Sequence, residues 1–304
     1  MPPPLPIVYH PAYSVPLPAA HRFPMPKFRA LYAHLDAAGL IGPTNRFVPE
    51  PAPSAWLELV HTADYVAAIL GQRLDPAAER RLGLPLSPAL TERSRAAVAG
   101  TVLAARLALE HGIACNTAGG SHHAFADAGS GFCVFNDVAV AAAVLLVEGA
   151  VRRVLVVDLD VHQGDGTALI FRNDPRVVTF SMHAATNFPA RKQQSDVDVA
   201  LARDLDDHGY LGELERRLPD LLDCVRPDLV FYNAGVDPHR DDRLGHLALT
   251  DDGLAARERT VLAVALDRGV PVVGIIGGGY DRDLDRLARR HGILHRTAAA
   301  LMPG

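Results

Sequence analysis

Short apolar runs rich in β-branched residues alternate with longer amphipathic segments through the second half of the chain. This alternation restricts the fold more than any other feature of the sequence. The runs have the length of strands buried on both faces, and the longer segments repeat apolar residues at helical spacing. Such strands, when they alternate with helices, predict a parallel sheet with helices on both faces. We therefore expect a three-layer α/β/α architecture around one open, mainly parallel sheet.

The length and the punctuation of the chain predict one domain. A chain of 304 residues has a size that α/β folds often build around a single sheet, so residues 1–304 are expected to form a single domain. The proline-bearing segments Pro49–Pro53 and Leu82–Pro88 are too short to separate two domains and are predicted to be surface loops. Strands are expected at Ile7–Tyr9, Val154–Asp158, Val177–Met182, Leu229–Asn233 and Val272–Ile276. Helices are expected at Lys27–Ala38, Pro88–Glu110, Asp137–Glu148, Leu211–Cys224, Thr250–Asp267 and Asp283–His291.

Composition argues against several classes of protein. The formal net charge of -5 provides no general attraction to nucleic acid or to an anionic membrane, so a cationic or neutral partner is easier to accommodate. Three widely spaced cysteines resemble neither a disulfide framework nor a paired metal motif, which suits a reducing cytoplasm. The proline-rich start lacks the pattern of a secretory signal, and no apolar stretch reaches the roughly 18–20 residues of a membrane span. We expect a cytoplasmic protein that binds neither nucleic acid nor membrane directly; its oligomeric state is left open.

Ionisable residues recur at every second position where one of the expected strands ends. Extended backbone would project Asp158, Asp160 and His162 to one side, at the edge where parallel sheets bind ligands. Carboxylates gathered near a core favour a bound cation, and a solvated acidic turn is the alternative. Asp237 follows another expected strand; on its own, an Asp before Pro238 would suggest only a turn. Two Asp oxygens and one His nitrogen can hold zinc and leave positions for water and a substrate carbonyl.

Two further segments carry candidate catalytic groups. His122 and His123 follow a glycine pair, and imidazole suits proton transfer near neutral pH; an exposed loop is the alternative interpretation. Gly277–Gly279 let the backbone turn tightly after an expected strand and aim Tyr280 toward a ligand, where its hydroxyl can donate to an oxyanion. A flexible turn with a packing tyrosine is the alternative there.

Five motifs, in this order from Gly119 to Tyr280, resemble the histone deacetylase family: GGSHHA, GFCVFND, DLDVHQGDG, NAGVD and GGGY. The resemblance implies the arginase/deacetylase fold and hydrolysis of the amide bond in an acylated lysine or a similar amine. The segments PIVYHPAY at Pro6–Tyr13 and NAGVDPHRDDRLG at Asn233–Gly245 are more similar to class IV and its bacterial relatives. This narrower resemblance implies that acyl chains longer than acetyl are accepted or preferred.

Motif position carries the family's roles to individual residues. Its zinc ligands fall on Asp160, His162 and Asp237. Its catalytic groups fall on His122, His123, Asp158, Asp165 and Tyr280. Within this set the resemblance implies that His123 transfers the proton, that His122 is its electrostatic partner, and that Tyr280 stabilises the oxyanion. Asp158 and Asp165 would orient the two rings and set their basicity.

The resemblance also implies cation and substrate contacts. A monovalent cation, usually potassium in the family, would be bound by Asp158, Asp160, His162, Ser181 and Met182. A second such cation would lie near Phe171, Asp174 and Val177. Substrate contacts are expected from Gly131, Phe132, Phe188 and Gly278. Phe132 and Phe188 would form walls of the acyl-lysine tunnel, although each can equally pack in the core. Other histidines, such as His34, His208 and His291, are expected at the surface.

The sequence therefore predicts a zinc-dependent hydrolase that uses metal-activated water. Its substrate would be an acylated lysine in a protein or peptide, or an acylated polyamine or other small amine. One alternative is a binuclear manganese ureohydrolase of the arginase type, which needs a second metal bridged by further carboxylates. The other alternative is a catalytically silent protein that binds acyl-lysine and keeps the pocket for regulation.

Overall fold

The computed structural model describes residues 4–302, and these residues form one eight-stranded sheet in which every pair of neighbouring strands is parallel. The strand order is β2-β1-β3-β8-β7-β4-β5-β6. The strands are β1 (Ile7–Val8), β2 (Arg46–Phe47), β3 (Ile113–Asn116), β4 (Val154–Asp158), β5 (Val177–Ala184), β6 (Val197–Leu201), β7 (Leu229–Asn233) and β8 (Val272–Ile275). The central strands β3, β4, β7 and β8 are buried throughout, as expected of a parallel sheet covered on both faces.

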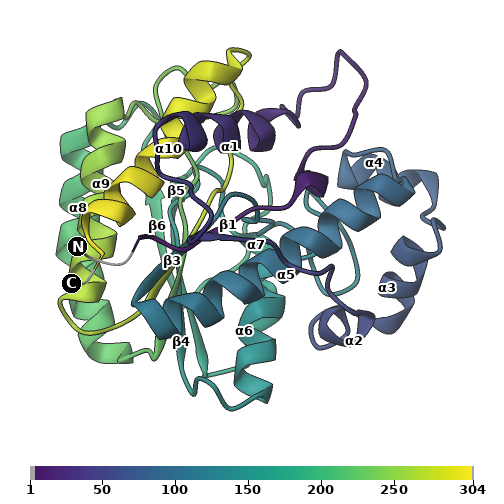
Figure 1. The fold of residues 1–304 in the computed structure, drawn as a ribbon, viewed down its shortest axis with the longest axis horizontal. Coiled ribbons are helices and arrows are strands. Elements are labelled where there is room, and N and C mark those ends of the chain that lie inside the picture. Colours follow the sequence, from purple (N-terminus) through teal and green to yellow (C-terminus); the bar gives the residue numbers. More distant parts are fainter. Residues whose placement is uncertain (1–3, 303–304) are drawn as a thin grey trace.

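Helices cover the sheet in two layers (Figure 1). The helices are α1 (Lys27–Ala37), α2 (Ser54–Leu57), α3 (Ala63–Leu70), α4 (Pro76–Leu82), α5 (Pro88–His111), α6 (Asp137–Val147), α7 (Asp165–Phe171), α8 (Asp207–Val225), α9 (Asp251–Leu266) and α10 (Leu284–Ala300), with a short 3-10 turn at Pro11–Tyr13. In one layer α1 packs on α10, α10 on α9 and α9 on α8, while α5 packs on α6 in the other. The helices α2, α3 and α4 lie together at one end of the molecule (Figure 1). The expected three-layer α/β/α fold is confirmed.

Helix starts follow ordinary capping chemistry. Ser87 accepts a hydrogen bond from Leu90 N ahead of Pro88 at the start of α5, and Asp206 accepts one from Gly209 N at the start of α8. Because Asp206 is the cap, α8 begins four residues before the predicted start at Leu211.

Several expectations about local structure were wrong or incomplete. The prediction for the last helix ended at His291, but α10 continues to Ala300, and His291 is only 1% exposed rather than at the surface. A side chain on Gly292 would lie 2.8 Å from the His34 ring, so this glycine allows α1 to approach α10 instead of ending the helix. The strands β2, β3 and β6 and the short helices α2, α3, α4 and α7 were not predicted.

The topology gathers five loops at one edge of the sheet. The neighbouring strands β3, β8, β7, β4 and β5 are parallel, so their carboxyl ends lie side by side. The segments that follow the first four of these strands contain the motifs GGSHHA, GGGY, NAGVD and DLDVHQGDG. The expected site edge therefore exists, at the place where open α/β sheets bind ligands.

Candidate active site

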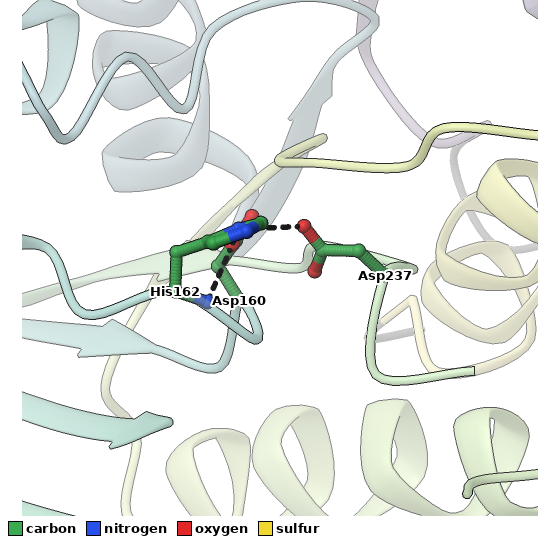
Figure 2. Close-up of side chains that lie close together, drawn as sticks. All are labelled: Asp160, His162 and Asp237. Carbon is green, nitrogen blue, oxygen red and sulfur yellow. Dashed lines mark hydrogen bonds and ion pairs between the residues drawn. The ribbon is translucent and has the colours of Figure 1, made fainter. Parts of the chain in front are cut away.

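Three buried donor atoms converge after β4 and β7. Asp160, His162 and Asp237 each offer one ligand atom, and these atoms all lie within 4.8 Å of one another. His162 Nδ1 is 2.9 Å from Asp160 Oδ1 and 3.1 Å from Asp237 Oδ2. Figure 2 shows the imidazole of His162 directed toward the Asp237 carboxylate, with Asp160 beside it. Ligands bound at roughly 2.0–2.2 Å around one zinc ion are separated by distances of this order.

The backbone holds the two carboxylates in place. Gly278 N donates to Asp160 Oδ2 at 2.6 Å, and Val161 N donates to Asp237 Oδ1 at 2.9 Å. A Cβ at Gly278 would collide with Asp237 Oδ2, so the loop after β8 can approach both carboxylates only because it lacks a side chain there. The other oxygen of each carboxylate is directed toward the His162 ring, and Asp160 Oδ1 also accepts a hydrogen bond from His162 N at 3.0 Å.

The chemistry of this donor set fits a divalent cation. Asp237 is fully buried, and its Oδ2 has no hydrogen-bond partner of good geometry within residues 4–302. Burial and the Asp160 carboxylate raise the pKa of Asp237 to about 7. Burial disfavours the charged form of His162, but Asp160 and Asp237 outweigh it and raise its pKa to about 10. Charges this crowded need a counter-charge, which a zinc ion held by these three atoms would supply.

His122 is placed by a turn that two glycines make possible. Gly119 and Gly120 both have positive φ, and Gly120 N and Ser121 N donate to the buried carboxylate of Asp137 at the start of α6. His122 Nδ1 lies 2.6 Å from Asp158 Oδ2, and Asn233 Nδ2 donates to Asp158 Oδ1 at 2.9 Å. Burial disfavours the imidazolium, but Asp158 and Asp160 raise the pKa of His122 to about 9.

His123 has the opposite electrostatic setting. Its Nδ1 lies 2.6 Å from Asp165 Oδ1, while burial and the neighbouring His122 lower its pKa to about 4. The two rings are 4.1 Å apart, centroid to centroid. One ring of the pair therefore favours the charged form and the other favours the neutral form, which is the separation of pKa values that acid–base roles require.

Tyr280 closes the site from the loop after β8. Its backbone N donates to Asp242 Oδ2 at 2.7 Å, and its ring lies 6.1 Å from the His162 ring. Burial and the carboxylates of Asp237 and Asp160 raise the pKa of the Tyr280 phenol well above its usual value. The phenol therefore keeps its proton and can act as a hydrogen-bond donor.

The two phenylalanines predicted to line a tunnel both border candidate catalytic groups. The Phe188 ring is 4.8 Å from the His123 ring and is 43% exposed, so it is not a core residue. The Phe132 ring lies 6.2 Å from the Tyr280 ring. Gly131 has positive φ, and a Cβ there would lie 2.6 Å from His123 Cδ2. Phe132, Phe188 and Gly131 line an open hollow of about 450 Å³ that reaches His123, His162 and Tyr280.

The residues expected to bind monovalent cations are also located. Ser181 and Met182 are buried in β5, and Ser181 pairs with Asp158 in the sheet register, next to the donor cluster. At the second expected cation site, the Asp174 carboxylate already has a cationic partner. It accepts hydrogen bonds from Arg176 Nε and Nη2 at 2.8 and 2.7 Å.

Two buried cations behind the cluster were not predicted from the sequence. Lys27 and Arg93 are 2% and 5% exposed, and they line a cavity of about 30 Å³ together with His122, His123 and Tyr280. Lys27 Nζ donates to Gly277 O at 2.9 Å, and Arg93 Nε donates to Tyr13 O at 3.0 Å. Within residues 4–302 neither side chain has a carboxylate partner at ion-pair distance.

The loop that carries the candidate metal ligands also has a buried support that the sequence did not indicate. Arg257 is fully buried on α9, and its Nη1 donates to Leu159 O at 3.1 Å, next to Asp160. Its Nη2 donates to Glu258 at 2.7 Å, and Glu258 also accepts from Tyr232 OH. Arg257 and Glu258 are neighbours on α9, so their ion pair compensates two buried charges, while the hydrogen bond to Leu159 O connects α9 to the loop.

The fold and the site first define a class: an open parallel α/β protein with a candidate metal centre at the carboxyl ends of its strands. Comparison with known proteins then identifies the family. The sequence profile described as the histone deacetylase domain matches residues 21–293. This chain belongs to the histone deacetylase family.

Individual relatives agree with this family. An uncharacterised protein of a Picosynechococcus strain is 56% identical over 96% of this chain and 98% of its own length. Histone deacetylase 2 of Arabidopsis thaliana is 35% identical over 64% of this chain and 51% of its own length. Acetoin utilization protein AcuC of Bacillus subtilis is 28% identical over 90% of this chain and 77% of its own length. This chain thus spans about half of the plant relative. Family membership supports a hydrolase of the deacetylase type.

A solved structure confirms the fold. The crystal structure of the HDA15 HD domain covers 99% of this chain with a TM-score of 0.82, and this chain covers 90% of that structure. Its sequence identity of 21% makes this a comparison of folds only. No helix within residues 4–302 is both long enough and apolar enough to cross a membrane.

Proposed function

We propose that this protein is a zinc-dependent deacylase that hydrolyses the amide bond between an acyl group and a lysine or related amine. One observation carries the proposal: the buried Asp160, His162 and Asp237 cluster lies beside a histidine pair of unequal basicity and a protonated tyrosine. A zinc ion bound by the cluster would polarise the substrate carbonyl and lower the pKa of water toward roughly 7–9.

Each group of this chain has one step in the proposed reaction. His123 Nδ1 faces Asp165, which leaves Nε2 of the neutral ring to accept the proton of the attacking water. Negative charge then develops on the substrate carbonyl oxygen, and the Tyr280 hydroxyl donates a hydrogen bond to it. The charged ring of His122 stabilises this charge electrostatically. His123 returns its proton to the departing amine nitrogen, and the products are a carboxylate and an amine.

A small cavity beside the candidate zinc ligand Asp160 favours a short acyl group. The cavity volume of about 30 Å³ leaves room for little more than a water molecule or a methyl group. Lys27 and Arg93 make its wall cationic, and a methylene chain would have to displace water from charged groups there. We therefore propose acetyl-lysine, rather than the long-chain acyl-lysine that the class IV resemblance implies, as the preferred substrate.

The monovalent cation remains part of the proposal. Asp158, Asp160, His162, Ser181 and Met182 would hold potassium largely through backbone oxygens, beside the zinc ligands. Because Ser181 is paired with Asp158 between β4 and β5, such an ion would connect the end of β4 to β5.

Turnover of a fluorogenic acetyl-lysine peptide by zinc-loaded protein tests the proposal. Release of the amine by the wild type, with loss of release in Asp237→Asn, is the expected result. Binding of the peptide without turnover would favour the catalytically silent alternative. Two manganese ions per chain, with hydrolysis of a guanidino compound, would favour the ureohydrolase alternative.

A further inference from the structure

Four arginines surround the mouth of the site. Arg22, Arg80, Arg81 and Arg243 line the hollow of about 450 Å³ that leads to His123 and Tyr280, and no Asp or Glu of the described part of the chain lines it. All four side chains belong to exposed residues, and within residues 4–302 none of them forms an ion pair. The mouth is therefore cationic although the whole chain has a formal net charge of -5.

The positive charge continues beyond the mouth. A second hollow of about 530 Å³ shares Arg22 and Arg243 with the first and adds Arg29 and Arg282. Among the residues that the structure describes, Asp281 is the only acidic one in its lining, and the Asp281 carboxylate is already engaged by Arg286 at 2.5 Å and by Arg290 at 3.1 Å. Six arginines thus face two adjoining hollows with no free carboxylate among their lining residues.

Hydrogen bonds fix the segments that carry these arginines against the tunnel wall. His21 Nε2 lies 2.9 Å from Gly83 O, which ties the segment of Arg22 to the end of α4, where Arg80 and Arg81 occupy the last turn. Phe132 N donates to Leu82 O at 2.8 Å, so α4 is also tied to the tunnel wall itself. Asn187 Nδ2 donates to the carbonyl oxygen of Leu244, which follows Arg243.

Three segments far apart in the sequence therefore present arginines around one opening. The basic pair at the end of α4 also complements the helix dipole, but Arg22 and Arg243 lie outside helices and have no such role. A common cause that covers all four is an anionic partner at the mouth, because guanidinium groups bind carboxylates with paired hydrogen bonds.

We propose that the substrate is an acylated lysine in an acidic protein segment, with Asp or Glu side chains close to the modified residue. This assignment rests on the proposed deacylase function and specifies its substrate class. The arginines would bind the flanking carboxylates while the acyl-lysine enters between Phe132 and Phe188. A basic segment, such as one rich in lysine, would be repelled at the same mouth.

Three acetyl-lysine peptides of equal length, flanked by aspartate, by lysine or by neutral residues, test the proposal. We expect kcat/KM to be at least about 10-fold higher for the acidic than for the basic peptide at low ionic strength. This ratio follows from several exposed ion pairs, each of which changes kcat/KM by roughly 1.5- to 5-fold. The ratio should fall as KCl is raised, because the Debye length shortens to about 8 Å at 0.15 M.

Double variants test whether the arginines at the mouth cause the preference for the acidic peptide. R80Q/R81Q should reduce the acidic-to-basic ratio by roughly 2- to 25-fold, whereas R80K/R81K should retain most of it. R152Q/R153Q is the matched control, because it removes two adjacent exposed arginines that precede β4, at the opposite end of the strand from the site. This control should leave the ratio unchanged. Thermal midpoints of all variants show whether α4 remains folded.

The outcomes separate this assignment from the deacylase proposal itself. Normal turnover of the neutral peptide with an acidic-to-basic ratio near one, or below one, would overturn the assignment and leave the deacylase function standing. If no peptide is hydrolysed, polarisation of the same peptides labelled with fluorescein measures the charge preference directly, and equal binding would overturn it. Competition by duplex DNA as effective as that by the acidic peptide would also overturn the choice of a protein segment.

Discussion

Replacing Asp237 with Asn tests whether this side chain binds a metal ion or only packs in the core. Asn has nearly the same size and can keep the hydrogen bond that Val161 N donates to Asp237 Oδ1 at 2.9 Å. It removes the negative charge at Oδ2, which faces His162 Nδ1 at 3.1 Å. The variant should therefore lose a zinc ligand without losing its place in the fold.

The sign of the stability change depends on the metal. Without metal, two carboxylates whose ligand atoms lie within 4.8 Å of each other repel by about 3 kcal/mol at an effective dielectric constant of 20. His162 attracts the Asp237 carboxylate, but burial and Asp160 outweigh this attraction, because together they raise the pKa of Asp237 to about 7. A carboxylate with a raised pKa costs the fold free energy when it is charged, as it is at pH 8. Metal-free Asp237→Asn should therefore be as stable as metal-free wild type at pH 8, or more stable by up to about 3 kcal/mol. An ordinary substitution at a buried polar position destabilises instead.

With zinc bound, the wild type should be more stable than Asp237→Asn. Free zinc at 1,000 times its dissociation constant stabilises the wild type by about 4 kcal/mol, which raises Tm by roughly 8 °C for a chain of this size. Asp237→Asn should show little of this rise. Scanning calorimetry of chelator-treated protein, with and without zinc, measures both quantities, and elemental analysis measures the bound metal. Tyr280→Phe is the control, because it lies in the site without being a ligand and should keep the zinc-dependent rise.

Two results would refute this reasoning. A zinc-dependent rise in Tm for Asp237→Asn as large as that of the wild type would remove Asp237 from the metal site. Loss of more than about 2 kcal/mol in the metal-free variant would mean that the carboxylate stabilises the fold by itself, contrary to the like-charge argument.

Three further outcomes are expected. Tyr280→Phe should lower kcat by roughly 10²–10³, measured with an acetyl-lysine peptide, because one oxyanion donor is lost; an unchanged kcat would leave Tyr280 as a packing residue. His123→Ala should reduce turnover more than His122→Ala, and equal, mild effects would contradict the division of roles between the two rings. kcat/KM should decline from acetyl- to octanoyl- to myristoyl-lysine peptides of one sequence, and a rise with chain length would show that the cavity opens to admit apolar chains.

The arrangement of the sheet could be predicted largely because its central strands are apolar and their polar residues begin where the strands end. The strand β4 was predicted with its observed bounds, and so was β7. The strand β3 was missed because Ile113–Asn116 is only four residues long, contains Ala and Cys, and follows α5 after a single Gly112. The edge strand β6 is half exposed and lacks a continuous apolar run. Short strands of this kind are specified by their neighbours in the sheet more than by their own residues.

In the candidate site, too, some residues could be predicted from local sequence and others depend on contacts between distant segments. Asp160 and His162 could be proposed because they follow the end of a predicted strand, and His123 because it belongs to a glycine-flanked histidine pair in a motif that resembles the family. The contacts of Lys27 with Gly277 O and of Arg93 with Tyr13 O join positions 250 and 80 residues apart, and no local pattern predicts them. In the sequence these two side chains are ordinary polar residues of amphipathic helices.

The net charge of the chain likewise did not predict the local charge at the entrance of the site. A formal charge of -5 suggested a cationic or neutral partner, but charge acts locally, within about 8 Å in physiological salt. The carboxylates nearest the chemistry are buried as candidate metal ligands or as partners of the histidines, so a bound dication would neutralise part of their charge. The arginines at the mouth are exposed and without ion pairs in the described residues, so they determine the field along the entrance. An approaching substrate would therefore encounter positive charge first, which is the physical basis for expecting an acidic segment around the acylated lysine.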